Sequence, residues 1–84
     1  MSTNGTKDTK LISSDIIPKD VRINILKSEA QLHKNTKWLY EQRYAVAQSL
    51  GKSESVLDAI EKDVLSEQME IKKYEERIAA IEAE

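Results

Sequence analysis

A single glycine divides this chain into two long stretches that contain neither glycine nor proline. The first stretch covers residues 21–50, the second covers residues 56–84, and Gly51 lies between them. Glycine and proline are the residues least favourable inside a helix, and glycine is common just past a helix end. The sequence therefore predicts an all-α protein. We expect one helix over residues 18–50, a turn over 51–54 and a second helix over 55–83.

Signals typical of helix starts precede each stretch. Pro18 suits the first position of the first helix, where a backbone N–H has no partner inside the helix. Ile16 and Val21 would then occupy the two positions of a hydrophobic staple. Ser53 or Ser55 can cap the second helix with its side-chain oxygen.

The first 17 residues differ in composition from the rest of the chain. Residues 1–10 are polar and show no helical periodicity. Such a segment cannot bury enough apolar surface to become ordered. The sequence predicts a flexible N-terminal tail over residues 1–17, which includes a short isoleucine-rich segment over 11–17.

The second stretch carries one apolar row whose steps alternate between three and four residues. The row consists of Leu57, Ile60, Val64, Ile71, Tyr74, Ile78 and Ile81, and Glu67 occupies its single polar position. The first stretch holds an apolar column with a seven-residue spacing: Ile25, Leu32, Leu39 and Val46. An antiparallel fold-back that sets Val46 opposite Leu57 and Ile25 opposite Ile78 makes both rows meet. The sequence predicts an antiparallel two-helix coiled-coil hairpin in this register.

Polar residues interrupt this predicted pairing at regular intervals. Glu29, Thr36 and Arg43 share one column of the first helix, and Thr36 falls opposite Glu67. In one interpretation these side chains lie at the edge of the seam and reach water. In the other they fix the register, with Glu67 accepting a hydrogen bond from Thr36 or Arg43.

The first helix is apolar over a wider arc than one partner helix can cover. Leu26, His33, Tyr40 and Tyr44 lie beside the predicted seam, and Trp38 lies on a further face. We expect these five residues to form a protein interface, because aromatic side chains are common at interface centres. The expected partner is a second copy, which would complete a four-helix bundle, or a different helical protein. A buried His33 would favour its neutral form, so association is expected to weaken below about pH 6.

The residue types exclude most chemistry. The chain has no cysteine and one histidine, so we expect no metal and no cofactor. No nucleotide-binding or nucleophile motif is present, and a helical hairpin offers no enclosed pocket. We therefore expect no catalytic residue and no enzyme. No apolar run is long enough to cross a membrane, and the first residues lack the apolar core of a signal peptide, so we expect a cytoplasmic protein.

Binding of another protein is the function that these features favour. We expect a non-enzymatic interaction module: an adaptor, an assembly chaperone or a small inhibitor of a larger complex. The alternative is a nucleic-acid-associated accessory protein that uses Lys27, Lys34, Lys37 and Trp38. The net charge of −2 argues against nucleic acid, because a phosphate backbone attracts basic surfaces.

Overall fold

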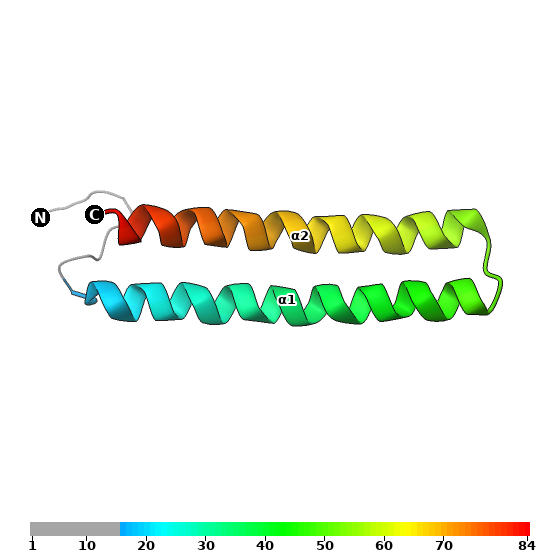
Figure 1. The fold of residues 1–84 in the computed structure, drawn as a ribbon, viewed down its shortest axis with the longest axis horizontal. Coiled ribbons are helices and arrows are strands. Elements are labelled where there is room, and N and C mark those ends of the chain that lie inside the picture. The colour runs from blue at the N-terminus through cyan, green and yellow to red at the C-terminus, as the bar shows by residue number, and fades with distance from the viewer. Residues whose placement is uncertain (1–15) are drawn as a thin grey trace, which may run out of the picture.

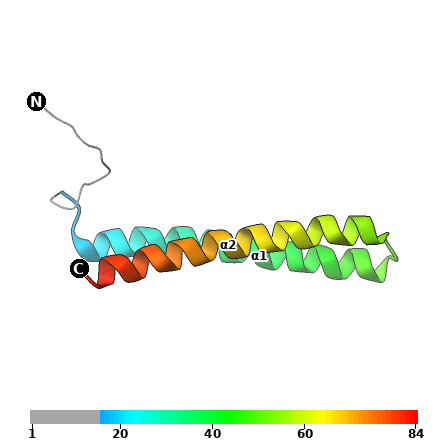
Figure 2. The ribbon, with the colours of Figure 1, turned by 90° about the horizontal axis from the view of Figure 1, so that it is seen from above.

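The computed structural model describes residues 16–84, which form two long antiparallel helices lying side by side (Figure 1). Helix α1 spans Lys19–Ser49 and helix α2 spans Glu54–Glu82. Seen after a 90° turn, the two helices cross at a shallow angle near their middle (Figure 2). The predictions of an all-α protein and of a two-helix hairpin are confirmed. The predictions made for residues 1–15 lie outside the described part of the chain.

The chain reverses direction through a glycine-dependent motif at the end of α1. Gly51 has a φ of +69°, which residues with a Cβ rarely adopt. Its N–H donates to the carbonyl of Gln48 at 3.1 Å, and the N–H of Lys52 donates to the carbonyl of Ala47 at 3.0 Å. These are the two hydrogen bonds of a Schellman motif. The position of the glycine therefore determines where the hairpin turns.

Of the two candidate serines, Ser53 caps α2. Its backbone is extended, and its Oγ accepts a hydrogen bond from the N–H of Val56 at 3.4 Å. Ser55 lies inside the first turn of α2, and its hydroxyl is 3.1 Å from the Ser53 hydroxyl.

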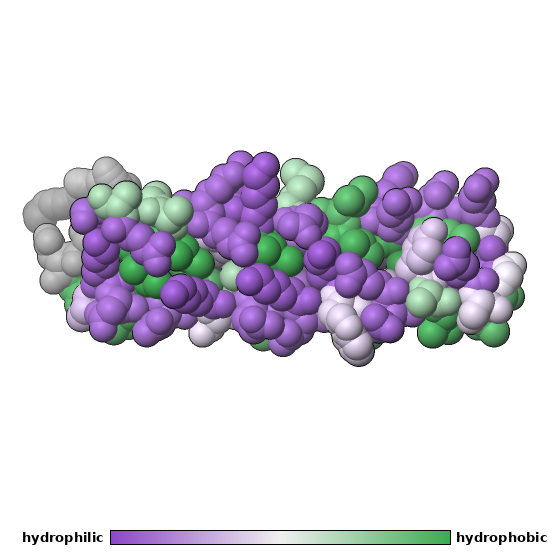
Figure 3. Space-filling view, viewed as in Figure 1, coloured by the Kyte–Doolittle hydropathy of each residue, from purple (hydrophilic) through white to green (hydrophobic). Residues whose placement is uncertain are grey.

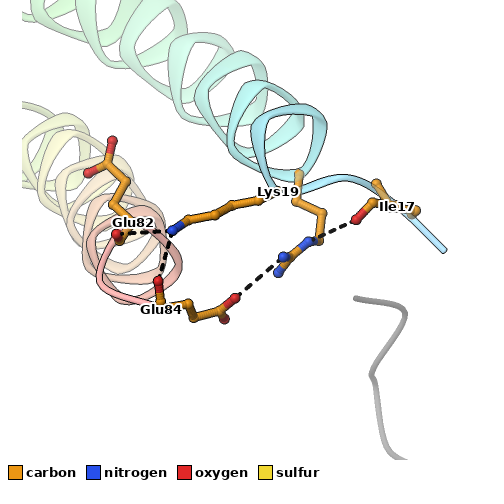
Figure 4. Close-up of polar contacts among 5 residues, drawn as sticks. Ile17, Lys19, Glu82 and Glu84 are labelled. Atoms are coloured by element: carbon orange, nitrogen blue, oxygen red, sulfur yellow. Dashed lines mark hydrogen bonds and ion pairs between the residues drawn. The ribbon is translucent and has the colours of Figure 1, made fainter. Parts of the chain in front are cut away.

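Polar contacts join the start of α1 to the end of α2 (Figure 4). The Lys19 Nζ donates to the backbone carbonyls of Glu82 and Glu84, at 3.3 and 3.0 Å. A cation at this place is favourable because the C-terminal end of a helix carries unpaired carbonyls and partial negative charge. Arg22 adds an ion pair to the Glu84 carboxylate at 3.3 Å. These contacts hold the two ends of the hairpin together.

The hydrophobic staple predicted from Ile16 and Val21 is absent. Ile16 is 81% exposed and Val21 is 41% exposed. The reason is that α1 begins one residue later than expected, with Pro18 as its N-cap. The two staple positions thereby move to Ile17 and Arg22, where the Arg22 Nε donates to the Ile17 carbonyl at 3.1 Å.

The apolar row of α2 faces α1, as the sequence predicts. Every residue of α2 that is buried or half-buried belongs to this row, and the remaining positions are exposed. Ile71, Ile78 and Ile81 are the most deeply buried, at 4–8% exposure. The row of α2 is therefore read correctly from its spacing alone.

The row of α1 that meets α2 differs by one residue from the predicted one. The predicted column is exposed: Ile25 by 55%, Leu32 by 59%, Leu39 by 44% and Val46 by 56%. The side of α1 that meets α2 instead holds an unbroken row with steps of three and four, and half-buried Arg22, Glu29 and Thr36 lie along one edge of it. This row consists of Ile23, Leu26, Ala30, His33, Lys37, Tyr40, Tyr44 and Ala47.

The physical reason for this difference lies in the neighbours of each column. A helix needs two interleaved columns to fill a seam, and the predicted column is flanked on its seam side by Arg22, Glu29 and Arg43. The observed row places Ala30 and Ala47, 3% and 6% exposed, where small side chains let the backbones approach closely. The predicted register is therefore wrong for α1, although the antiparallel direction and the α2 row are correct.

Candidate interaction surface

A cluster of polar side chains lies in the middle of the seam. The Nδ1 of His33 is 2.6 Å from an Oε1 of Glu67, and its Nε2 is 3.9 Å from a carboxylate oxygen of Glu70. The imidazole also stacks on the ring of Tyr74, with centroids 5.5 Å apart. Ile71 is the buried residue of α2 within the span of these three contacts, and we infer that it lies opposite His33. From seven-residue steps in both directions we infer that Leu26 lies opposite Ile78, Tyr40 opposite Val64 and Ala47 opposite Leu57.

The hydrogen bond to Glu67 raises the pKa of His33 above its usual value. Desolvation acts in the opposite direction, while the charges of Glu67, Glu70 and Glu29 raise the pKa further. The expectation of a neutral His33 is thus reversed. Because the folded-state pKa is raised, protonation of His33 stabilises the hairpin.

We expect the hairpin to melt at a higher temperature at pH 6 than at pH 8. The contribution of His33 is fully present below its unfolded-state pKa of about 6.5 and disappears as the pH rises through its raised folded-state pKa. Circular dichroism melts between pH 5.5 and 8, at one protein concentration, measure this difference. His33→Gln is the control and should remove most of the pH dependence. Equal melting of the native chain at both pH values would contradict the prediction.

The remaining residues of the predicted polar layer have separate surroundings. The Thr36 hydroxyl donates to the Leu32 carbonyl of its own helix at 3.0 Å. The guanidinium of Arg43 lies 5.3 Å from the centre of the Tyr40 ring. Glu29 is half-buried at the edge of the seam. The partner of Glu67 across the seam is therefore His33, and neither Thr36 nor Arg43 takes that place.

Four of the five residues expected at a partner interface lie against α2. Leu26, His33, Tyr40 and Tyr44 are half-buried on the side of α1 that faces α2. Most of the surface of these four residues is thus covered within the chain. Trp38 lies on the opposite side and is 62% exposed.

The side of α1 that points away from α2 carries no charge at any position. We call this side the outer face. It consists of Val21, Asn24, Ile25, Ser28, Gln31, Leu32, Asn35, Trp38, Leu39, Gln42, Ala45, Val46 and Ser49. All of these residues are exposed. A third of the chain is charged, so a water-facing helix surface without a single charge is unusual.

Helix α2 shows the ordinary pattern on its own water-facing side. That side includes the charged residues Asp58, Lys62, Lys72, Lys73 and Glu76. In α1 the charged residues lie in the seam or along its edges, and several pair with α2, as Lys34 does with Glu75 at 3.4 Å. Helix α1 thus differs from an ordinary amphipathic helix. Its charged residues lie in or beside the seam, and the side that faces water is uncharged.

Four apolar residues of the outer face share one column along α1. Ile25, Leu32, Leu39 and Val46 repeat every two helical turns, or about 10 Å. Near the turn the row widens into a shallow groove, which Leu39, Val46 and Leu50 line on its apolar side. In Figure 3 hydrophobic atoms reach the lower edge of the molecule over α1, most clearly at the end next to the turn. Single exposed apolar residues are common on protein surfaces, whereas several along one uncharged side of a helix make that side a candidate for binding.

The lysines considered for nucleic-acid binding are mostly engaged with carboxylates. Lys34 pairs with Glu75, and Lys37 pairs with Glu41 at 3.5 Å. Lys27 borders a hollow beside Glu75 and Glu82. Acidic side chains beside each lysine weaken attraction to a phosphate backbone.

Sequence reasoning identified Trp38 but assigned the apolar column of the outer face to the seam. The signal that separates the two surfaces is the distribution of charge. Charged residues accompany the buried row on both edges, whereas uncharged Ser28, Asn35 and Gln42 accompany the exposed column. This signal becomes readable once the orientation of α1 is known.

Fold and surface together define a helical hairpin with one uncharged, partly apolar side. Comparison with known protein families, with curated proteins and with solved structures finds no match for this chain. Across residues 16–84, neither helix is long and apolar enough to cross a membrane. Over the same residues no group of three histidine, aspartate or glutamate side chains is arranged to hold a metal ion.

Proposed function

We propose that this protein is a non-enzymatic protein-interaction module of the cytoplasm, and that the outer face of α1 is its binding surface. The observation that carries the proposal is the complete lack of charge on this exposed side of α1. Transfer of Ile25, Leu32, Leu39 and Val46 from water to a protein interface is favourable by roughly 25 cal/mol per Å² of apolar area. Trp38 adds a large side chain of the kind that dominates interface energies.

A helix is the partner that fits this surface best. The outer face has the same steps of three and four residues as the buried row, so a second helix can pack along it. An adaptor, an assembly chaperone and an inhibitor of a larger complex would all use such a face. Recognition of nucleic acid has weaker support, because Lys34 and Lys37 are paired with carboxylates.

Site-specific photocrosslinking tests this function in the cells that make the protein. A photoreactive amino acid at Gln42 or Trp38 probes the outer face, and the same group at Met69 probes the water-facing side of α2. Met69 is a matched control because it is 65% exposed, close to the 62% of Trp38. We expect discrete protein adducts from Gln42 and Trp38 and none from Met69. Adducts from all three positions alike, or from none, would contradict a binding role for the outer face.

A further inference from the structure

The charges along one edge of the outer face are arranged for self-recognition. This edge is the column Arg22, Glu29, Thr36, Arg43 and Leu50, which runs between the outer face and the seam. Arg22 is already engaged by Glu84 and Ile17. Among residues 16–84, Glu29 and Arg43 form no ion pair with an acidic or basic side chain. They lie at equal sequence distances on either side of Thr36, with opposite charges.

The hairpin itself shows which edge residues of two antiparallel helices lie opposite each other. Where His33 lies opposite Ile71, the edge residues Lys34 and Glu75 meet at 3.4 Å. These two pairs give the position of an edge pair relative to a facing pair along antiparallel helices. We apply the same relative position to two copies of α1 that pack antiparallel through their outer faces. One arrangement sets Leu32 opposite Asn35 and Val46 opposite Val21 of the other copy. At the edge, Glu29 then lies opposite Arg43 of the other copy, and the pair occurs twice by symmetry.

The same arrangement satisfies one further condition, the overlap of the two helices along their length. It brings Lys19–Ser49 of both copies into register over nearly their whole length, because the symmetry axis falls at the middle of α1. Because Thr36 is midway between Glu29 and Arg43, the same pairing sets each Thr36 beside the Thr36 of the other copy. A shift by one heptad in either direction leaves one end of each α1 uncovered and moves Glu29 away from Arg43. In a two-fold dimer the same surface of both copies meets, so that surface must be complementary to itself in charge and must overlap along its length.

From this match we propose that the chain forms an antiparallel homodimer in which the outer faces of two α1 helices pack together. The dimer deepens the proposed function, since it names a second copy as the partner of that surface. Because the outer face points away from α2, the four helices form a flat layer in the order α2, α1, α1, α2. This layer differs from the closed four-helix bundle that the sequence suggests.

Charge reversal tests the dimer and its direction. The full chain is examined by analytical ultracentrifugation over a range of concentrations at low ionic strength. We expect a dimer of twice the 9.6 kDa chain mass. Glu29→Arg or Arg43→Glu alone turns two attractive pairs into two repulsive ones and should raise the dissociation constant by about tenfold or more. The double variant Glu29→Arg with Arg43→Glu restores both pairs and should return the constant close to that of the native chain.

Circular dichroism at a concentration below the dimer range shows that each variant still folds. Leu32→Asp with Leu39→Asp should abolish the dimer, because it puts unpaired charges into the interface. A monomer at every concentration would overturn the proposed dimer. So would a dimer that these substitutions leave unchanged, or a double variant weaker than both single ones. If the chain is a monomer and photocrosslinking at Gln42 still captures a different protein, the interaction module stands and only self-recognition fails. If crosslinking also fails, the proposed function fails with it.

Discussion

Replacing Ile71 by alanine is expected to lower the free energy of unfolding of the hairpin by about 2–5 kcal/mol. Ile71 is 4% exposed and lies at the middle of the seam, opposite His33. The substitution removes three carbon atoms from a site with little freedom to collapse, because the two long helices hold it from both sides. The higher helix propensity of alanine returns only a few tenths of a kcal/mol. Thermal or urea unfolding followed by circular dichroism at one protein concentration measures the loss.

Leu65→Ala is the matched control for this substitution. Leu65 lies on the water-facing side of α2 and is 56% exposed, so its truncation should change the unfolding free energy by about 0.5 kcal/mol or less. The comparison avoids the outer face of α1, where association would add to any effect. Similar losses at both positions would mean that α2 packs through a different side.

Two engineered cysteine pairs distinguish the observed register of α1 from the register that the sequence favours. The chain has no cysteine, so each pair is unique. Tyr40→Cys with Val64→Cys joins positions that face each other across the seam. Under mild oxidation this pair should form a disulfide within one chain and stabilise the hairpin by about 3 kcal/mol, because it closes a loop in the unfolded chain. A melt with and without reductant measures the gain.

Leu39→Cys with Val64→Cys serves as the comparison. Leu39 is 44% exposed and points away from α2, so its cysteine should stay reduced within a single chain. Rapid oxidation of the Leu39 pair, together with a slow Tyr40 pair, would restore the register predicted from sequence and overturn the observed one.

The buried row of α2 can be predicted from the sequence more accurately than that of α1, because α2 has only one apolar row. One row of α2 is apolar, its other sides carry charge, and periodicity therefore selects one face. Helix α1 offers two rows one residue apart, and the exposed one, with Ile25 and Leu32, is the more apolar. Hydrophobicity alone selects that row. The structure selects the other because Ala30 and Ala47 permit close approach and because His33 meets Glu67.

The same ambiguity between two rows of α1 prevents the sequence from identifying the candidate surface. Once Ile25, Leu32, Leu39 and Val46 are assigned to the seam, the remaining apolar residues of α1 suggest an interface around Leu26 and Tyr40. Rotating α1 by one residue exchanges the two surfaces. Of the five residues expected at a partner interface, only Trp38 is exposed under both orientations, because it lies away from both rows. A single angular error in one helix is therefore enough to exchange a core with the candidate surface.

The contacts of Lys19 and Arg22 with the end of α2 also determine how the hairpin responds to mechanical load. They bring both ends of the described chain to one pole of a rod, and the turn at Gly51 lies roughly 45 Å away. Tension applied between these ends pulls perpendicular to the helices, so it opens one layer at a time. The first contacts to break are those of Lys19 and Arg22, and the layer of Ile23 and Ile81 follows. Helices loaded from opposite poles would instead have to break all layers together, which takes a larger force.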